Sequence, residues 1–146
     1  MKYSEINKDL FTVDDTYYLA HCISADFGMG RGIVVQFNRR FNMKNKLKEK
    51  YPDYLHDFCR IGEGDCILED NVFNLITKER YWGKPTYESV TQALEKCKKI
   101  CIEKNIKKIA MPTIACGLDG LNWDKVSQII KEVLKDTDIE ILVCKI

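Results

Sequence analysis

The sequence predicts a single α/β domain, residues 1–146, in which buried strands alternate with amphipathic helices. The length of 146 residues suits one domain of ordinary size. Short apolar runs, which are typical of strands covered on both faces, recur along the chain. In the second half these runs alternate with segments of helical periodicity, and that order implies right-handed crossovers over both faces of a sheet.

The first half of the chain is expected to hold a strand, a helix and a hairpin. Residues 17–24 form a short apolar run that indicates a buried strand. Residues 28–32 carry three alternating glycines, and apolar residues at helical spacing over 33–41 predict a helix directly after them. Residues 66–68 and 72–77 flank a turn-like acidic triplet, so we expect a β-hairpin there.

The second half alternates helix and strand more clearly. Apolar residues share one face over residues 86–105, which predicts a long helix that begins after Pro85. Residues 106–111 predict the next strand, and Asn122 is suited to cap a second helix. An apolar run at residues 139–144 predicts the final strand.

Composition restricts the class of protein. The 23 basic and 22 acidic residues leave a net charge of +1, which argues against binding nucleic acid chiefly through phosphates but leaves a local basic groove open. No apolar run is long enough to span a membrane, and the N-terminus has no apolar signal segment, so we expect a soluble, cytoplasmic domain.

Seven cysteines are an odd number for a disulfide framework, and no C-x-x-C occurs, so we expect reduced thiols. Cys97 and Cys101 have a spacing that suits metal ligands on a helix. Because only His21 and His56 are available as further ligands, we expect no metal site and interpret these cysteines as small core residues.

Two glycine-bearing loops follow predicted strands. Gly28, Met29, Gly30 and Gly32 lie before a predicted helix, where backbone N–H groups can approach phosphate oxygens. The spacing fits neither a Walker A loop nor G-x-G-x-x-G, and a simple turn is an open alternative. The second loop spans residues 112–120, and ligands of open α/β sheets bind outside such strand ends. The two loops together indicate a cleft for a phosphorylated ligand.

Three side chains near these loops are candidates for chemistry. Asp119 has glycines close by on both sides, so its carboxylate either projects freely or serves as a turn former or helix cap. Lys78 ends an apolar strand and is either a solvated charge or a desolvated amine that attacks an electrophilic carbon. Cys116 has no base near it in sequence, so a nucleophilic role is less expected.

Six segments, taken in order from about residue 3 to the C-terminus, match one known family. They are Asp9-Leu10-Phe11, Leu19-Ala20-His21-Cys22-Ile23-Ser24, Met29-Gly30 with Gly32-Ile33, Leu75-Ile76-Thr77-Lys78, Lys84-Pro85-Thr86-Tyr87-Glu88, and Met111-Pro112 with Cys116-Gly117-Leu118-Asp119. Through them the chain resembles the macrodomains, and among these the branch of terminal ADP-ribose protein glycohydrolases and O-acetyl-ADP-ribose deacetylases. The resemblance implies a three-layer α/β/α fold around a mixed, roughly six-stranded sheet, and ADP-ribose binding without cofactor or metal.

The resemblance also implies which positions bind ADP-ribose. Adenine would lie near the end of the first strand and the C-terminal residue, and the diphosphate and distal ribose near the two loops. The positions are Asp9, Leu10 and Ile146 on the adenine side, Ser24, Gly28, Met29, Gly30 and Gly32 in the first loop, and Thr113, Ile114, Ala115, Cys116, Gly117 and Leu118 in the second.

Catalysis in this branch is attributed to a lysine and an aspartate, which match Lys78 and Asp119. The implied reaction is attack of the lysine amine on the anomeric carbon of the distal ribose, followed by hydrolysis of a lysyl adduct. It would release ADP-ribose from acidic side chains of modified proteins and deacylate O-acyl-ADP-ribose. Attack needs the neutral amine, which burial favours and a nearby carboxylate opposes, so the sequence leaves this balance open.

The chain departs from the family at three positions. Lys8 precedes Asp9 where relatives usually carry glycine, and Thr113 and Ala115 stand where arginine and glycine are frequent. Affinity or substrate preference is therefore expected to differ. The alternatives are a DNA ADP-ribosyl glycohydrolase of the antitoxin type, whose relatives carry an extra C-terminal region, and an ADP-ribose-binding module without turnover. We expect a monomer.

Overall fold

The computed structural model describes residues 1–146. Its strands are β1 (Lys2–Asn7), β2 (Tyr18–Ser24), β3 (Asp65–Glu69), β4 (Val72–Lys78), β5 (Lys108–Met111) and β6 (Glu140–Lys145). Its helices are α1 (Val34–Phe41), α2 (Met43–Lys50), α3 (Tyr54–Ile61), α4 (Tyr87–Lys104) and α5 (Trp123–Leu134), with a short 3-10 helix η1 (Leu10–Thr12). None of the helices has both the length and the apolar character that crossing a bilayer requires.

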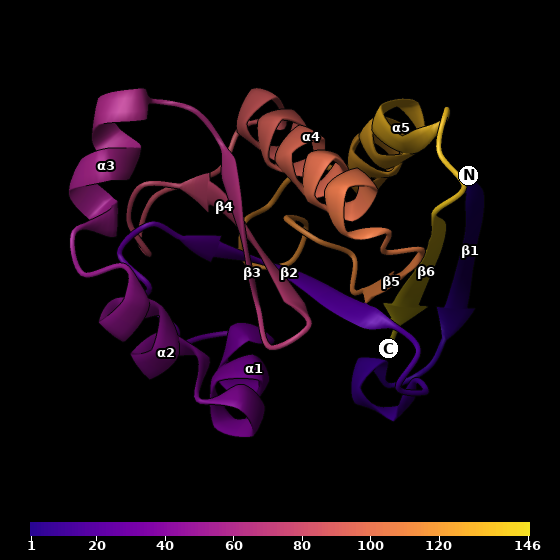
Figure 1. Ribbon diagram of the computed structural model, residues 1–146, viewed down its shortest axis with the longest axis horizontal. Helices are drawn as coiled ribbons and strands as arrows, with labels where there is room; N and C mark the ends of the chain where they lie inside the picture. Colours follow the sequence, from indigo (N-terminus) through magenta and orange to yellow (C-terminus); the bar gives the residue numbers. More distant parts are fainter.

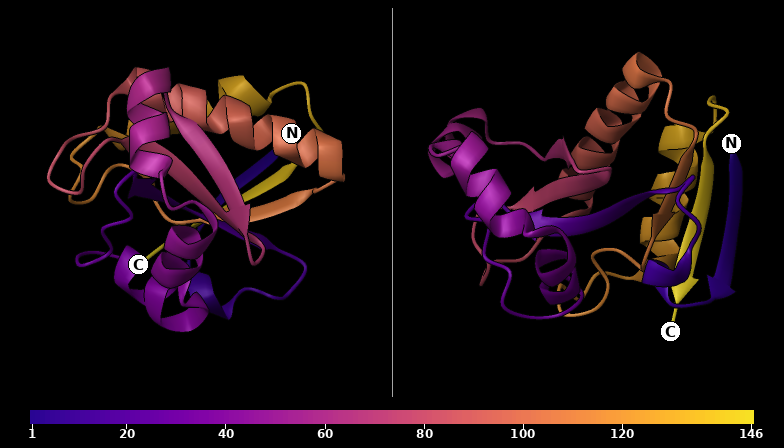
Figure 2. Two further views of the ribbon diagram at one scale, coloured as in Figure 1. Left: turned by 60° about the vertical axis from the view of Figure 1, so that its left-hand side comes forward. Right: turned by 60° about the horizontal axis from the view of Figure 1, so that its bottom comes forward.

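The six strands form one mixed sheet in the order β1-β6-β5-β2-β4-β3. All neighbouring pairs are parallel except β3 and β4, which form the predicted antiparallel hairpin. Helices α4 and α5 cover one face of the sheet, and α1, α2 and α3 lie on the other side (Figure 1, Figure 2). The expected three-layer α/β/α fold with a mixed six-stranded sheet is therefore confirmed.

Alternation along β4 supplies both layers of the core. Phe73 and Leu75 point to the face covered by α4 and α5, while Val72 and Ile76 point to the face covered by α1 to α3. All but the last residue of this strand are buried. A strand covered on both faces has no polar side to expose, which is why its sequence reads as one apolar run.

Helix ends follow the local sequence. Thr86 and Ser89 form a reciprocal capping box at the start of α4, with both hydrogen bonds at 3.0 Å. Asn105 ends this helix in the left-handed region, at φ 57°. The predicted cap of α5 is also confirmed, because Asn122 Oδ1 accepts a hydrogen bond from Lys125 N at 3.2 Å.

Besides the short η1, three elements were not predicted, and the strand expected over residues 106–111 begins only at Lys108. Strand β1 lies at the sheet edge with nearly all side chains exposed, so it has no apolar run. Helix α2 buries only Met43 and Leu47 among lysines, and α3 buries only Tyr54 and Phe58. Two buried residues per helix give too weak a period to be recognised.

All seven cysteines are free. Cys97 and Cys101 lie on the buried face of α4, as small core residues are expected to. No three His, Cys, Asp or Glu side chains come together as a group that could hold a metal ion.

Candidate active site

Three loops meet where neighbouring parallel strands end. Strands β5, β2 and β4 are adjacent in the sheet, so the segments that follow them share its carboxyl edge. Pairing continues beyond β2, because Ala25 N donates to Lys78 O at 2.9 Å and Asp26 N donates to Glu79 O at 3.2 Å. The first glycine loop (residues 25–33) therefore lies between the β5–α5 loop (residues 112–122) and the β4–α4 loop (residues 79–86).

Lys78 and Asp119 form an ion pair at this edge. Lys78 is the last residue of β4, Asp119 lies in the loop before α5, and Nζ is 2.7 Å from Oδ1. The side chains are 14% and 17% exposed, respectively. The pair is thus shielded from bulk water but still reachable. Because this lysine is paired and largely buried, its interpretation as a simple solvated charge is wrong.

The carboxylate of Asp119 belongs to a turn rather than to a helix cap. Asn122, not Asp119, caps α5. Two backbone hydrogen bonds close the loop, from Gly120 N to Gly117 O at 3.2 Å and from Leu121 N to Ala115 O at 3.0 Å. Both ends of this loop are thereby fixed, and Asp119 is held facing Lys78.

Two cysteines lie close to the ion pair. Burial, together with the negative charge of Asp119, raises the pKa of Cys116 to about 11 and that of Cys22 to about 12. Both thiols therefore stay protonated near neutral pH. A protonated thiol is a poor nucleophile, so the structure gives Cys116 no support as the attacking group.

Asp26 fastens the first loop and was missed by the sequence analysis. Its carboxylate accepts hydrogen bonds from Ser24 Oγ, from Gly28 N at 3.1 Å and from Tyr81 N at 3.1 Å. Burial opposes its ionisation, but these hydrogen bonds and the charge of Arg80 outweigh burial and lower the pKa of Asp26. A carboxylate between a buried strand and a glycine loop is the signal that could have identified it.

Close approaches hold the three loops together. A Cβ added to Gly28 would lie 2.8 Å from Tyr81 Cβ, so only glycine leaves room for the β4–α4 loop there. Gly32 adopts φ +76°, and its Cβ position would be 3.4 Å from a methyl group of Leu118. Lys84 Nζ donates to Leu118 O at 2.7 Å. The β4–α4 loop therefore contacts both glycine-bearing loops.

The residues expected on the adenine side lie farther along the same edge. Strands β1 and β6 are parallel neighbours, so Asp9, Leu10 and Ile146 follow strand ends that adjoin each other. Asp9 Oδ1 accepts from Phe11 N at 3.0 Å, Leu10 is buried, and Ile146 is 98% exposed. Strand order separates them from Lys78 by β5 and β2.

The other expected positions divide by burial. The buried and half-buried positions form the base of the two loops: Ser24, Gly28, Met29, Thr113, Ile114, Ala115 and Cys116. The exposed positions form the tips of the loops: Gly30, Gly32, Gly117 and Leu118. Ala115 adopts φ 62°, a left-handed conformation that glycine accepts more readily. The backbone of this loop therefore has a glycine-like shape at a position where relatives often carry glycine.

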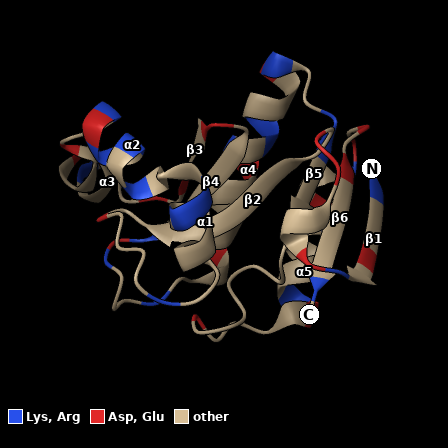
Figure 3. Cartoon of the chain, turned by 90° about the horizontal axis from the view of Figure 1, so that it is seen from below, with Lys and Arg blue, Asp and Glu red and all other residues tan.

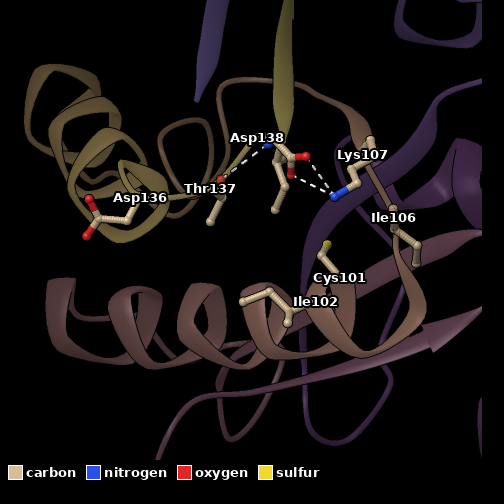
Figure 4. Close-up of a pocket in the computed structure, with 8 residues that line it drawn as sticks. Cys101, Ile102, Ile106, Lys107, Asp136, Thr137 and Asp138 are labelled. Carbon is tan, nitrogen blue, oxygen red and sulfur yellow. Dashed lines mark hydrogen bonds and ion pairs between the residues drawn. The ribbon is translucent and has the colours of Figure 1, made fainter.

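Two cavities lie at opposite edges of the sheet. One of about 380 Å³ adjoins the ion pair and is lined by Lys78, Glu79, Arg80, Trp82, Gly83 and Lys84. The other, of about 410 Å³, lies between the ends of α4 and α5 and includes Cys101 and the Lys107–Asp138 ion pair (Figure 4). No predicted site residue lines this second cavity. Of these two cavities only the smaller is lined by Lys78, so it is the candidate active site.

Comparisons with known proteins agree with this fold. A family model described as "Macro domain" matches residues 21–130. The human protein named ADP-ribose glycohydrolase OARD1 is 40% identical over 140 residues, covering 94% of this chain and 88% of its own length. The DNA ADP-ribosyl glycohydrolase of Mycobacterium tuberculosis is 29% identical over 126 residues, 78% of this chain but 34% of that protein.

Solved structures are similar in fold. The structure titled "Macrodomain of Mycobacterium tuberculosis DarG" has a TM-score of 0.75 at 21% identity and covers 97% of this chain and 96% of its own. "Macrodomain of Thermus aquaticus DarG" has a TM-score of 0.73 at 23% identity, with 97% of each chain covered. At these identities the likeness concerns the fold alone.

Proposed function

The chain belongs to the macrodomain family, and from this premise we propose that it is an ADP-ribosyl hydrolase acting on acyl-linked ADP-ribose. The substrates proposed are glutamate and aspartate side chains that carry terminal ADP-ribose, and O-acyl-ADP-ribose. The human relative, 40% identical along nearly the whole chain, is named an ADP-ribose glycohydrolase, which supports hydrolysis. The observation that carries the proposal is the 2.7 Å contact between Lys78 Nζ and Asp119 Oδ1 beside a cavity.

The order of strands supports a direction for the ligand. In this proposal adenine lies near the ends of β1 and β6, and the diphosphate crosses the loops that follow β5 and β2. Free backbone N–H groups at such loops suit phosphate oxygens. The distal ribose then reaches the end of β4, and its anomeric carbon C1″ faces the Lys78 amine.

The first proposed step forms a covalent adduct. The ammonium of Lys78 passes a proton to Asp119, which lies within hydrogen-bond distance, and the neutral amine attacks C1″. A bond forms between Nζ and C1″ while the bond from C1″ to the acyl oxygen breaks. The acid leaves as a carboxylate and needs no proton, since carboxyl groups are ionised near neutral pH.

The second proposed step hydrolyses the adduct. Water adds its oxygen to C1″ after losing a proton to the Asp119 carboxylate, which has by then released its earlier proton to solvent. The bond between Nζ and C1″ breaks, and the amine regains a proton from Asp119. The enzyme returns to its starting ion pair and ADP-ribose is released.

A release assay tests the proposal. Wild type, Lys78→Ala and Asp119→Ala are incubated with glutamate-ADP-ribosylated protein, and free ADP-ribose is measured over time. Lys107→Ala is a matched control, because Lys107 forms an ion pair of similar length, 2.8 Å, at the opposite edge of the sheet. We expect Lys78→Ala to lose release by at least about a hundredfold, as losing a nucleophile does, and to retain ADP-ribose binding in calorimetry.

The outcomes separate the alternatives. Release by Lys78→Ala at the wild-type rate refutes Lys78 as the nucleophile. If wild type binds ADP-ribose but releases none, the chain is a binding module and the hydrolase proposal is wrong. Release from ADP-ribosylated DNA alone would favour the second candidate, a DNA ADP-ribosyl glycohydrolase, which the mycobacterial relative supports.

A further inference from the structure

Strand β4 carries one extra residue directly before Lys78. Ile23 of β2 lies opposite Ile76 of β4. The next residue of β2, Ser24, lies opposite Lys78, so Thr77 is a β-bulge without a partner on β2. A bulge bends its strand and changes the direction of nearby side chains, and bulges are frequent next to active sites. The direction of Lys78 therefore depends on what holds the two chains together beyond the bulge.

Hydrogen bonds of residues 25 and 26 hold the chains together beyond this bulge. Ala25 N donates to Lys78 O at 2.9 Å. Asp26 N donates to Glu79 O at 3.2 Å, and the Asp26 carboxylate accepts through Oδ2 from Tyr81 N at 3.1 Å. The carboxylate is thus the last of these contacts, and it joins β2 to the β4–α4 loop three residues after Lys78.

The first glycine loop holds the Asp26 carboxylate from its other side. Oδ1 accepts hydrogen bonds from Ser24 Oγ and from Gly28 N at 3.1 Å. Phe27 has a left-handed backbone, at φ 59°, which is unfavourable for a residue other than glycine, but its side chain is buried in the core. Packing therefore maintains this turn. The carboxylate and its three donors, Ser24 Oγ, Gly28 N and Tyr81 N, together form the Asp26 clamp.

Acidic and basic side chains around the clamp balance each other. They lie in or beside the smaller cavity and are Lys78, Arg80, Lys84, Asp26, Glu79 and Asp119. Lys78 pairs with Asp119, and Arg80 lies near two acidic side chains, Glu79 and Asp26. Basic and acidic residues are also interspersed over the rest of the molecule (Figure 3). Because removal of the Asp26 charge changes this balance, the charge and the hydrogen bonds of Asp26 require separate variants.

We propose that Asp26 is a positioning residue, which acts through Lys78 by holding the chain beyond the bulge so that the Lys78 amine faces C1″. The inference rests on the proposed function, in which this amine attacks C1″. Attack requires reacting atoms about 3–3.5 Å apart, and a misplacement of about 1 Å costs roughly a hundredfold in rate. Loss of the contact between Asp26 and Tyr81 N is therefore expected to slow the reaction while the loops that bind ADP-ribose keep their shape.

Two variants remove this hydrogen bond by different means. Asp26→Asn keeps one oxygen for the two donors of the first glycine loop but turns an NH2 group toward Tyr81 N, so two donors face each other. Tyr81→Pro removes the backbone N–H and leaves the Asp26 charge. Tyr81 is the second residue of a turn closed by a hydrogen bond from Gly83 N to Arg80 O at 2.9 Å, a position that favours proline. Tyr81→Ala is the matched control, because it removes the exposed ring but keeps the N–H.

The test separates the rate of reaction from binding. For wild type and the three variants, kcat and KM are measured with O-acetyl-ADP-ribose, and the Kd for ADP-ribose is measured by calorimetry. We expect Asp26→Asn and Tyr81→Pro to lower kcat roughly 10- to 100-fold and to change the Kd by less than about threefold. Tyr81→Ala is expected to leave kcat near the wild-type value. A role confined to the shape of the first glycine loop would instead raise the Kd, because that loop is expected to bind phosphate oxygens.

Each outcome decides one claim. The positioning role is overturned if both variants keep the wild-type kcat, if binding weakens as much as kcat falls, or if Asp26→Asn alone is slow, which would assign the effect to charge. If wild type hydrolyses no substrate, the proposed function fails, and the clamp is then decided by amide hydrogen exchange of Ala25, whose N–H donates to Lys78 O. Relative to Tyr81→Ala, both variants are expected to speed this exchange roughly 2- to 13-fold, the effect of one lost hydrogen bond, and unchanged exchange overturns the clamp.

Discussion

Lowering the pH is expected to destabilise the fold through one buried histidine. His21 is fully buried, its Nε2–H donates to Asn74 Oδ1 at 2.6 Å, and its ring stacks on Phe37 with centroids 3.9 Å apart. Nδ1 has no hydrogen-bond partner, so a second proton there would be buried without an acceptor. Burial lowers the pKa of His21 from 6.5 to about 4, although the hydrogen bond with Asn74 partly opposes this effect.

The pKa values give the size and sign of the effect. The difference between 6.5 and about 4 corresponds to about 3 kcal/mol, at about 1.4 kcal/mol per pKa unit. Between these values the unfolded chain binds more protons than the folded chain, so acid favours unfolding. The neutral ring's contribution is complete above pH 6.5 and is lost as the pH falls toward 4. Integration gives a loss of about 2.5 kcal/mol by pH 4.5.

Urea unfolding at pH 7.5 and pH 4.5 measures this loss. His21→Gln removes the titrating ring but retains an amide N–H for Asn74, so its free energy of unfolding is expected to fall by about 2.5 kcal/mol less than that of wild type over this interval. His56→Gln is the control, because His56 is exposed on α3. An equal fall in wild type and His21→Gln would refute the assignment of acid sensitivity to His21.

Two further predictions concern the loops of the site. Gly28→Ala is expected to lower the free energy of unfolding by about 1–3 kcal/mol, because the new methyl group overlaps Tyr81. Gly30→Ala is expected to change this free energy by less than about 0.5 kcal/mol, because nothing lies within 4 Å of its Cβ position. Urea unfolding compares the two, and similar values would contradict the close approach. Cys116→Ser is expected to keep at least half of wild-type ADP-ribose release, because a thiol with a pKa of about 11 stays protonated at pH 7.5; loss of release would restore Cys116 as a candidate nucleophile.

Strong periodicity made part of the fold predictable. Strands β2 and β4 and helices α4 and α5 each bury a continuous run or a full helical face, so burial left a clear pattern in their sequence. The same argument explains the failure at β1, which owes its structure to six register partners on β6 rather than to its own apolar residues. Pairing between segments more than 130 residues apart has no local signal.

The sequence predicted which residues belong to the site, but not how they come together in space. Lys78 and Asp119 were identified as candidates, yet only the adjacency of the β4 end and the β5–α5 loop brings them to 2.7 Å. Asp26 was overlooked because its role depends on contacts made in space: three hydrogen bonds converge on its carboxylate. Sequence spacing does not record such contacts.

The departures from the family pattern acquire a physical meaning in this geometry. Ala115 adopts the left-handed backbone that a glycine would, so the loop keeps its shape at a cost of about 1–2 kcal/mol in local strain. Thr113 has no positive charge, but Arg80 and Lys84 carry charge on the neighbouring β4–α4 loop. Lys84 Nζ donates to Leu118 O at 2.7 Å, so a cation contacts the β5–α5 loop although Thr113 supplies none.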